Sequence, residues 1–282
     1  MNCAWQAYIN LLPVWLRSEV DKRGKDHLQE LRLRLDEKPE LVLSTGSDYL
    51  ERAVNIDDLR FCINMASRYS PWSAASVAQG YITAHGGHRI GLCGEAVMVN
   101  NVMTGINSVS SICLRVARDF PGIAMKAAHL PGSILIIGNP GSGKTTLLRD
   151  LIRQKSNCGQ GSVALIDEKG EVFPHIHGKP CFSTGKRTDI LTGCGKAIGL
   201  EILLRNMGPD TIAVDEITAA EDCQALLHAG WCGVKLLATA HAGCLEDLMT
   251  RPVYKPLIQS KLFDHILILN SDKSWRVERM EV

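Results

Sequence analysis

The chain lacks the features that mark membrane and secreted proteins. Its 282 residues contain no continuous apolar run long enough to cross a bilayer. The N-terminus has no basic leader, and Pro13, Arg17 and Glu19 interrupt its apolar residues, so we expect no signal peptide. The charges nearly cancel, with 31 basic against 30 acidic residues, so no overall field attracts nucleic acid or anionic lipid. These absences favour a globular protein of the cytoplasm.

Disulfide and zinc motifs are also missing. The composition includes 10 cysteines, yet no two of them form a C-x-x-C pair. Cys62, Cys93, Cys113 and Cys232 stand among apolar or small residues, which predicts buried thiols that act as small hydrophobic side chains. We therefore expect neither a disulfide framework nor a structural zinc site.

The first 118 residues predict a small α+β domain. Residues 1–30 are expected to be helical. Their apolar side chains at helical spacing lie between Trp5 and Leu16, and we expect this stripe to pack in a core rather than dock to a membrane or partner. A second helix is expected after a cap at Asp57 or Asp58. Alternating patterns and turn residues predict strands over 28–35, 41–43, 81–87, 88–94, 97–99 and 111–116.

Residues 119–282 predict an α/β domain that begins after a linker near 119–122. Apolar segments alternate with helical ones, which is typical of a mostly parallel sheet covered on both faces. One of the helices is expected over 196–207, ending before Gly208-Pro209. The expected strands lie over 134–137, 163–167, 211–215, 235–240 and 265–269.

The strand at 134–137 leads into a loop that fills every position of G-x-x-x-x-G-K-[ST]. Glycines let backbone N–H groups converge on phosphate oxygens, and the following helix N-terminus favours negative charge. Lys144 is expected to meet the β- and γ-phosphates, and Thr145 to ligate Mg²⁺. A plain glycine-rich turn is the alternative. The expected nucleotide contacts are Gly138, Asn139, Pro140, Gly141, Ser142, Gly143, Lys144, Thr145 and Thr146.

Two strands of this domain end in an acidic pair. Asp215-Glu216 follows an apolar strand, where the Asp can hold Mg²⁺ and the Glu can orient an attacking water. Asp167-Glu168 repeats the arrangement on an earlier strand. Spacing alone leaves Glu216 and Glu168 as candidate bases. We prefer Glu216, with Asp167 and Glu168 supporting it or the metal.

Three further residues are candidates for contacts with phosphate. His241 ends the strand over 235–240 and could sense the γ-phosphate, although a capping or core histidine is the alternative. Arg115 and Arg118 end the first domain and could reach a phosphate across a domain or subunit boundary, although arginines taken alone are more often surface charges.

The ordered set of these motifs resembles the stage III sporulation protein AA family, a branch of the secretion-type ATPases. Lys169 stands where that family usually has Arg, and a lysine cannot make the planar two-pronged phosphate contact. The segment with Arg115 and Arg118 resembles the one that contains the family's arginines. The matching segments are residues 30–34, 86–97, 110–118, 166–171, 187–189, 193–196, 212–216 and 238–241.

The resemblance implies a RecA-like ATPase that uses ATP and Mg²⁺ on the mother-cell side of a developing spore. Such a protein would energise a channel between mother cell and forespore, bind membrane channel proteins and form a homo-oligomer, typically a hexameric ring. The alternatives are a nucleic-acid motor and a nucleotide-dependent scaffold with little turnover. Neutral charge argues against the first, and the paired acids against the second.

Overall fold

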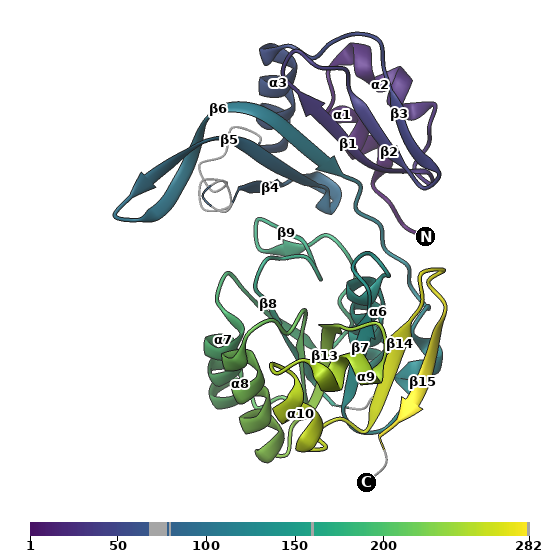
Figure 1. The fold of residues 1–282 in the computed structure, drawn as a ribbon, viewed down its shortest axis with the longest axis vertical. Helices are drawn as coiled ribbons and strands as arrows, with labels where there is room; N and C mark the ends of the chain where they lie inside the picture. The colour runs from purple at the N-terminus through teal and green to yellow at the C-terminus, as the bar shows by residue number, and fades with distance from the viewer. Residues whose placement is uncertain (68–77, 79, 159–160, 281–282) are drawn as a thin grey trace. The chain divides into compact units, whose positions relative to one another are not determined.

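In a computed structural model, which describes residues 1–67, 78, 80–158 and 161–280, the chain forms two compact units (Figure 1). Unit 1 comprises Met1–Asp119 and Pro174–Phe182. Unit 2 comprises Phe120–Phe173 and Ser183–Val282. The chain therefore passes between the units at three points, and no pattern in the sequence predicts the second piece of unit 1.

Unit 1 is built on a six-stranded antiparallel sheet in the order β3-β2-β1-β6-β5-β4. A two-stranded pair, β9 with β10, belongs to the same unit. Its elements are α1 (Trp5–Asn10), α2 (Val14–Asp21), β1 (Leu28–Arg34), β2 (Glu40–Leu43), β3 (Gly46–Tyr49), α3 (Ile56–Ser67), β4 (Tyr81–Thr83), η2 (His85–Gly87), β5 (Arg89–Val99), β6 (Val102–Arg115), β9 (His175–Ile176) and β10 (Lys179–Pro180).

Two helix predictions for unit 1 need correction. The helical stretch expected over 1–30 is two short helices, because Pro13 lacks an N–H group and begins α2 as its N-cap. Its apolar stripe does pack in the core, where Tyr8 and Leu12 are fully buried. The cap of α3 is Asn55 rather than an aspartate, since Asn55 Oδ1 accepts a hydrogen bond from the Asp58 N–H at 2.9 Å.

Strands β5 and β6 form one long hairpin that turns at Asn100-Asn101, both with positive φ (50° and 62°). Asn tolerates this conformation better than most residues. The short strands expected over 97–99 and 111–116 are therefore parts of one ribbon (Figure 1). Cys93 lies exposed on it, and Cys232 is exposed at the end of α8 (Ala220–Trp231), so the prediction that both are buried is wrong.

His88 joins three parts of unit 1 from a fully buried position. The Ala117 N–H donates to its Nδ1 at 3.1 Å, so Nδ1 is unprotonated and Nε2 donates to the Ala4 carbonyl at 3.0 Å. Burial lowers the pKa of His88 to about 4. The imidazole is therefore neutral in the folded protein at ordinary pH.

This histidine predicts a loss of stability in acid. Between pH 6.5 and 4 the unfolded chain binds a proton that folded His88 rejects, so the free energy of unfolding should fall with pH by about 3 kcal/mol in all. Denaturant titrations of the parent and of His88→Gln between pH 6.5 and 4 measure how much of this loss in the free energy of unfolding is due to His88. The exposed His129→Gln is the control and should keep the parental slope. An unchanged slope in His88→Gln would contradict the prediction.

Unit 2 contains a seven-stranded sheet in the order β11-β8-β12-β13-β7-β14-β15. All neighbours are parallel except β14 and β15. Its elements are α5 (Met125–Ala128), β7 (Ile134–Gly138), α6 (Lys144–Asn157), β8 (Val163–Asp167), β11 (Thr188–Thr192), α7 (Lys196–Asn206), β12 (Thr211–Val214), α8, β13 (Lys235–His241), α9 (Leu245–Thr250), α10 (Lys255–Gln259), β14 (His265–Leu269) and β15 (Trp275–Arg279).

The mostly parallel sheet and its five expected strands are confirmed, as is the helix expected at 196–207. Helices α7 and α8 pack on one face, in a core that includes Ile137 and Ile166. Ile134 and Ile136 alternate with Ile137 and face the opposite side, where α6 contacts β7 and β13. Among the described helices, none combines the length and apolarity needed to cross a membrane.

Candidate nucleotide site

The strand order of unit 2 brings the predicted motifs to one edge of the sheet. Strand β13 lies between β12 and β7, all parallel, so their carboxyl ends meet there. In register, His241 of β13 is paired with Gly138 of β7, and Val214 of β12 with Ala238 of β13. Such an edge is where open α/β sheets bind ligands.

The loop between β7 and α6 is held in a conformation that needs glycine. Gly141 and Gly143 have positive φ values of 75° and 103°. A Cβ on Gly138 would come within 2.6 Å of Ser142 Oγ and 3.0 Å of the Leu269 carbonyl oxygen. Glycine is therefore required at Gly138 by its packing and favoured at Gly141 and Gly143 by their backbone conformation.

The Lys144 ammonium group makes three contacts. Its Nζ donates to the carbonyl oxygens of Gly138 and Asn139 at 2.8 and 3.0 Å. It lies 3.0 Å from His241 Nδ1. An ammonium group only donates, so Nδ1 accepts and His241 is left with its proton on Nε2. That N–H donates to Glu216 Oε1 at 2.8 Å.

A second chain of hydrogen bonds runs through Asp215. The Thr145 hydroxyl donates to Asp215 Oδ2 at 2.8 Å, and the Thr239 hydroxyl donates to Oδ1 at 2.6 Å. The Glu216 N–H in turn donates to the Thr239 oxygen at 2.7 Å. Burial raises the pKa of Asp215, although both hydroxyl contacts lower it. The two chains, which we call the Asp215–His241 network, meet at Glu216.

Glu216 has an unusual backbone conformation, with a φ of 55°. A non-glycine residue in this region is strained, and such strain persists only where surrounding contacts fix it. The hydrogen bonds to Thr239 and His241 provide those contacts. The carboxylate is still 41% exposed, so water can reach it.

Asp167 lies on the neighbouring strand but uses its carboxylate differently. Oδ1 accepts from the N–H groups of Glu171 and Val172 at 2.8 and 3.2 Å, and Oδ2 from that of Phe173 at 2.8 Å. These bonds close the loop after β8. The geometry thus shows Asp167 stabilising this loop, while its expected role toward the metal stays a prediction.

Glu168 forms an ion pair with Lys196, a residue for which the sequence predicts no role. The Lys196 Nζ is 2.8 Å from Glu168 Oε2 and 3.9 Å from Asp222 Oδ2. Asp222 accepts from the N–H groups of Thr218 and Ala219, just after Glu216. Lys196 therefore connects the two acidic segments. The signal for it was weak, because one lysine at a predicted helix start is unremarkable.

Arg115 and Arg118 are both in unit 1 and contact residues of that unit. Arg115 Nε is 3.0 Å from Glu30 Oε1, and its side chain is 60% exposed. Arg118 donates to the carbonyl oxygens of Lys25 and Leu28. Arg118 thus fixes the turn that leads into β1, whereas the guanidinium of Arg115 is accessible.

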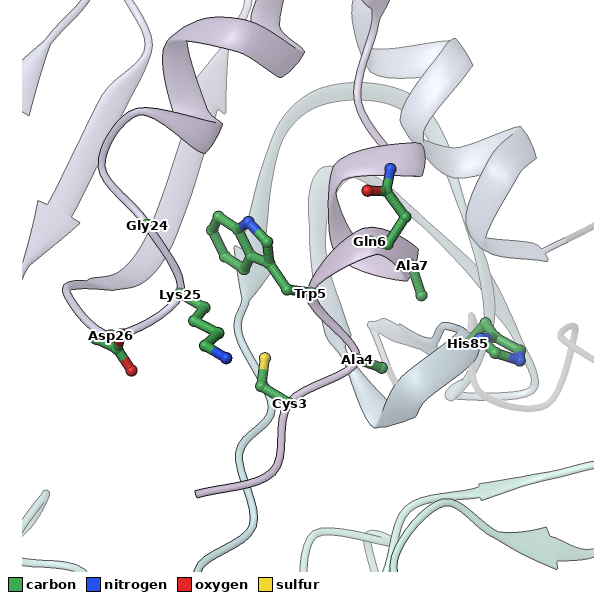
Figure 2. A pocket seen from close by; sticks show the side chains of 9 residues that line it. All are labelled: Cys3, Ala4, Trp5, Gln6, Ala7, Gly24, Lys25, Asp26 and His85. Carbon is green, nitrogen blue, oxygen red and sulfur yellow. The ribbon is translucent and has the colours of Figure 1, made fainter.

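Unit 1 also has a hollow of about 730 Å³, which the sequence did not predict. Its lining comes from the N-terminal segment, the turn after α2 and η2, and includes Trp5, Lys25 and His85 (Figure 2). The Trp5 indole N–H is taken by Asp21 at 2.6 Å. Nothing in this hollow resembles the convergence of lysine, hydroxyls and acids seen in unit 2.

The residues around the loop fit a nucleotide phosphate and a divalent cation. Ser142 Oγ is buried and has no hydrogen-bond partner among the described residues. Burial lowers the pKa of Lys144, and a phosphate anion beside the ammonium group would raise it. Thr145 and Asp215 offer the oxygen ligands that Mg²⁺ prefers.

Comparison with known proteins agrees with this architecture. The Legionella pneumophila ATPase DotB matches with a TM-score of 0.60 and 17% identity, over 96% of this chain and 82% of that one. The pilus retraction motor PilT with bound ADP matches with a TM-score of 0.62 and 13% identity, over 94% and 83%. At these identities the likeness establishes the fold, which is the RecA-like fold of secretion and pilus ATPases.

Proteins related in sequence identify the family more specifically than the structural neighbours do. Protein SEEDLING PLASTID DEVELOPMENT 1 of Arabidopsis thaliana is 24% identical over 273 residues, which is 89% of this chain and 36% of that protein. Stage III sporulation protein AA of Bacillus subtilis (strain 168) is 35% identical over 268 residues, covering 91% of this chain and 87% of that protein. The family model described as sporulation stage III, protein AA matches residues 6–278. The chain belongs to the stage III sporulation protein AA family.

Proposed function

We propose that this protein is an Mg²⁺-dependent ATPase that energises a secretion-type channel between mother cell and forespore. The observation that carries the proposal is the Asp215–His241 network, which joins the phosphate-binding lysine to the candidate base through one histidine. The family supplies the sporulation setting.

In this proposal each residue of the site has a separate role in hydrolysis. The loop and Lys144 bind the β- and γ-phosphates, and Ser142 gains the partner that its hydroxyl lacks. Thr145 and Asp215 would hold Mg²⁺, which neutralises charge on the phosphates when bound. Glu216 accepts a hydrogen bond from the attacking water and orients it. His241 contacts both Lys144 and Glu216, so a change in the position of Lys144 when phosphate binds can change the position of Glu216.

The direct test is phosphate release by the purified chain. Turnover with ATP should require Mg²⁺ and stop on chelation, because Thr145 and Asp215 supply oxygen ligands but no positive charge, and Lys144 alone does not neutralise the phosphates. Added single-stranded DNA should leave the rate unchanged, and stimulation by it would favour a nucleic-acid motor. ATP binding without turnover, in the oligomer as well as the monomer, would favour the scaffold alternative.

Partners and assembly follow from the same proposal. We propose a homo-oligomer, hexameric as is typical of secretion ATPases, that sits in the cytoplasm against a membrane channel complex. The Bacillus subtilis relative and the two structural neighbours named above support this setting. Light scattering with and without nucleotide measures the oligomer. Co-purification from sporulating cells identifies the membrane proteins.

Substitutions of Arg115 and Arg118 should have different effects. We propose Arg115 as the residue that completes an ATP site across a domain or subunit boundary, since its guanidinium is accessible. Arg115→Ala should lower kcat with little change in ATP affinity. Arg118→Ala should instead lower the stability of unit 1 by about 1–3 kcal/mol, because two carbonyls lose a charged donor. Parental turnover in Arg115→Ala would remove it from the site.

A further inference from the structure

Helix α6 follows the phosphate-binding loop directly and is buried on its polar side as well as its apolar side. Arg149, Asp150 and Arg153 are only 6%, 1% and 4% exposed. On a helix next to a sheet, charged side chains at these positions normally point into water. Here these side chains form hydrogen bonds with backbone groups of three separate segments, at residues 122–124, 171–172 and 183.

Asp150 holds the first of these segments. Its Oδ2 accepts hydrogen bonds from the N–H groups of Gly122 and Ala124 at 2.9 and 2.8 Å. Those residues lie just after the chain first enters unit 2, at Phe120. The other oxygen, Oδ1, is 2.9 Å from Nη1 of Arg153.

Arg149 and Arg153 hold the other two segments. Arg149 donates from Nη2 to the Glu171 carbonyl at 3.0 Å and from Nε to the Val172 carbonyl. These residues precede the point where the chain returns to unit 1. Arg153 donates from Nε to the Ser183 carbonyl at 2.8 Å, and Ser183 is the first residue after the chain re-enters unit 2.

We propose that Arg149, Asp150 and Arg153 are positioning residues that connect the nucleotide site to unit 1. Each of the three peptide connections between the units is hydrogen-bonded to one of them close to its crossing point. The helix that bears them begins at Lys144. A displacement of α6 by nucleotide therefore reaches all three connections together. This inference rests on the proposed function.

Stability alone does not explain why these side chains are charged. A buried ion pair pays a large desolvation cost, and apolar residues of similar volume often stabilise a fold as well or better. Hydrogen bonds from charged groups to backbone are directional, so they fix the position of a peptide segment along the helix. Apolar packing would allow the segment to slide. The chemistry of the three residues suits transmission of movement.

The test compares the parent with Asp150→Asn/Arg153→Met, which removes both members of the ion pair, so that neither is left as a buried charge without the other. The matched control is Glu201→Gln/Arg205→Met on α7, where the corresponding pair is exposed. Each protein is measured for ADP affinity, for ATP turnover and for hydrogen–deuterium exchange with and without ADP. The peptides of interest cover residues 120–124, 171–173 and 183–187.

We expect the double variant to bind ADP within about threefold of the parent while its kcat falls by about tenfold or more. ADP-induced protection should disappear at 183–187, weaken at 120–124, where an uncharged amide oxygen replaces the carboxylate as acceptor, and persist at 171–173, which Arg149 still holds. The control should match the parent throughout.

Parental turnover in the folded double variant would overturn the inference. So would a parent that binds ADP without any change in exchange at the three segments, a result that does not depend on the variant folding. A parent that does not bind ADP at all would instead overturn the proposed function, and this inference with it.

Discussion

Lys144→Ala should weaken triphosphate binding by roughly 10- to 100-fold and abolish measurable turnover. The substitution removes the Lys144 ammonium from the loop, and a hydrogen bond to a charged group contributes about 1.5–3 kcal/mol. It also leaves His241 Nδ1 without its donor, so the link from phosphate to Glu216 is cut. Equilibrium binding of a fluorescent ATP analogue and a phosphate-release assay measure the two effects.

Lys235→Ala is the matched control for this variant. Lys235 is exposed at the opposite end of β13 from His241, so its removal takes the same charge from the same sheet without touching the loop. It should bind and hydrolyse ATP like the parent. If Lys144→Ala did the same, the assignment of residues 138–145 as the phosphate site would be wrong.

Glu216→Gln should bind ATP normally but turn it over about 100- to 10,000-fold more slowly, the usual contribution of a positioned general base. The amide keeps the size of the side chain and can still meet His241, but it loses the negative charge that orients water. Because the backbone strain at Glu216 is unaffected, the fold should survive. Single-turnover hydrolysis with ATP bound beforehand separates the chemical step from binding.

Glu168→Gln is the control that separates the two acidic pairs. Glu168 is about as exposed as Glu216, at 39%, but its carboxylate is paired with Lys196 rather than with the network that includes Lys144. We expect a loss of less than about tenfold, because weakening that pair loosens the segment near Asp222 without removing the base. A larger loss in Glu168→Gln than in Glu216→Gln would assign the base to β8.

Local patterns predicted the sheet of unit 2 and the phosphate-binding loop because each is encoded in a short stretch of sequence. Buried parallel strands read as uninterrupted apolar runs, and β7 is fully buried along its length. The loop requires glycine and lysine at fixed spacing. The turn at Asn100-Asn101 was also visible, since few other residue types tolerate positive φ there.

What the sequence could not reveal depends on which segments become neighbours. Thr239 joins Asp215 to Glu216 only because β13 lies between β12 and β7, an order that no local pattern specifies. The same reason hides the structural use of Asp167, whose partners lie in an irregular loop. Strands β3, β9, β10, β11 and β15 are short or polar and have no strong period.

The short insertion of residues 174–182 into unit 1 has a consequence for how the protein is made. A Cβ on Gly87 would come within 3.2 Å of Pro174 and 3.3 Å of Cys181, so this part of unit 1 packs against a segment synthesised much later. Domains generally fold in the order in which they leave the ribosome. Here the phosphate-binding loop and α6 leave the ribosome before residues 174–182, which complete unit 1. The folding of unit 1 is therefore completed only after part of unit 2 has been synthesised. A cut at residue 119, the natural place to separate them by sequence, therefore leaves unit 1 without residues 174–182 and leaves that segment attached to unit 2 without its partners.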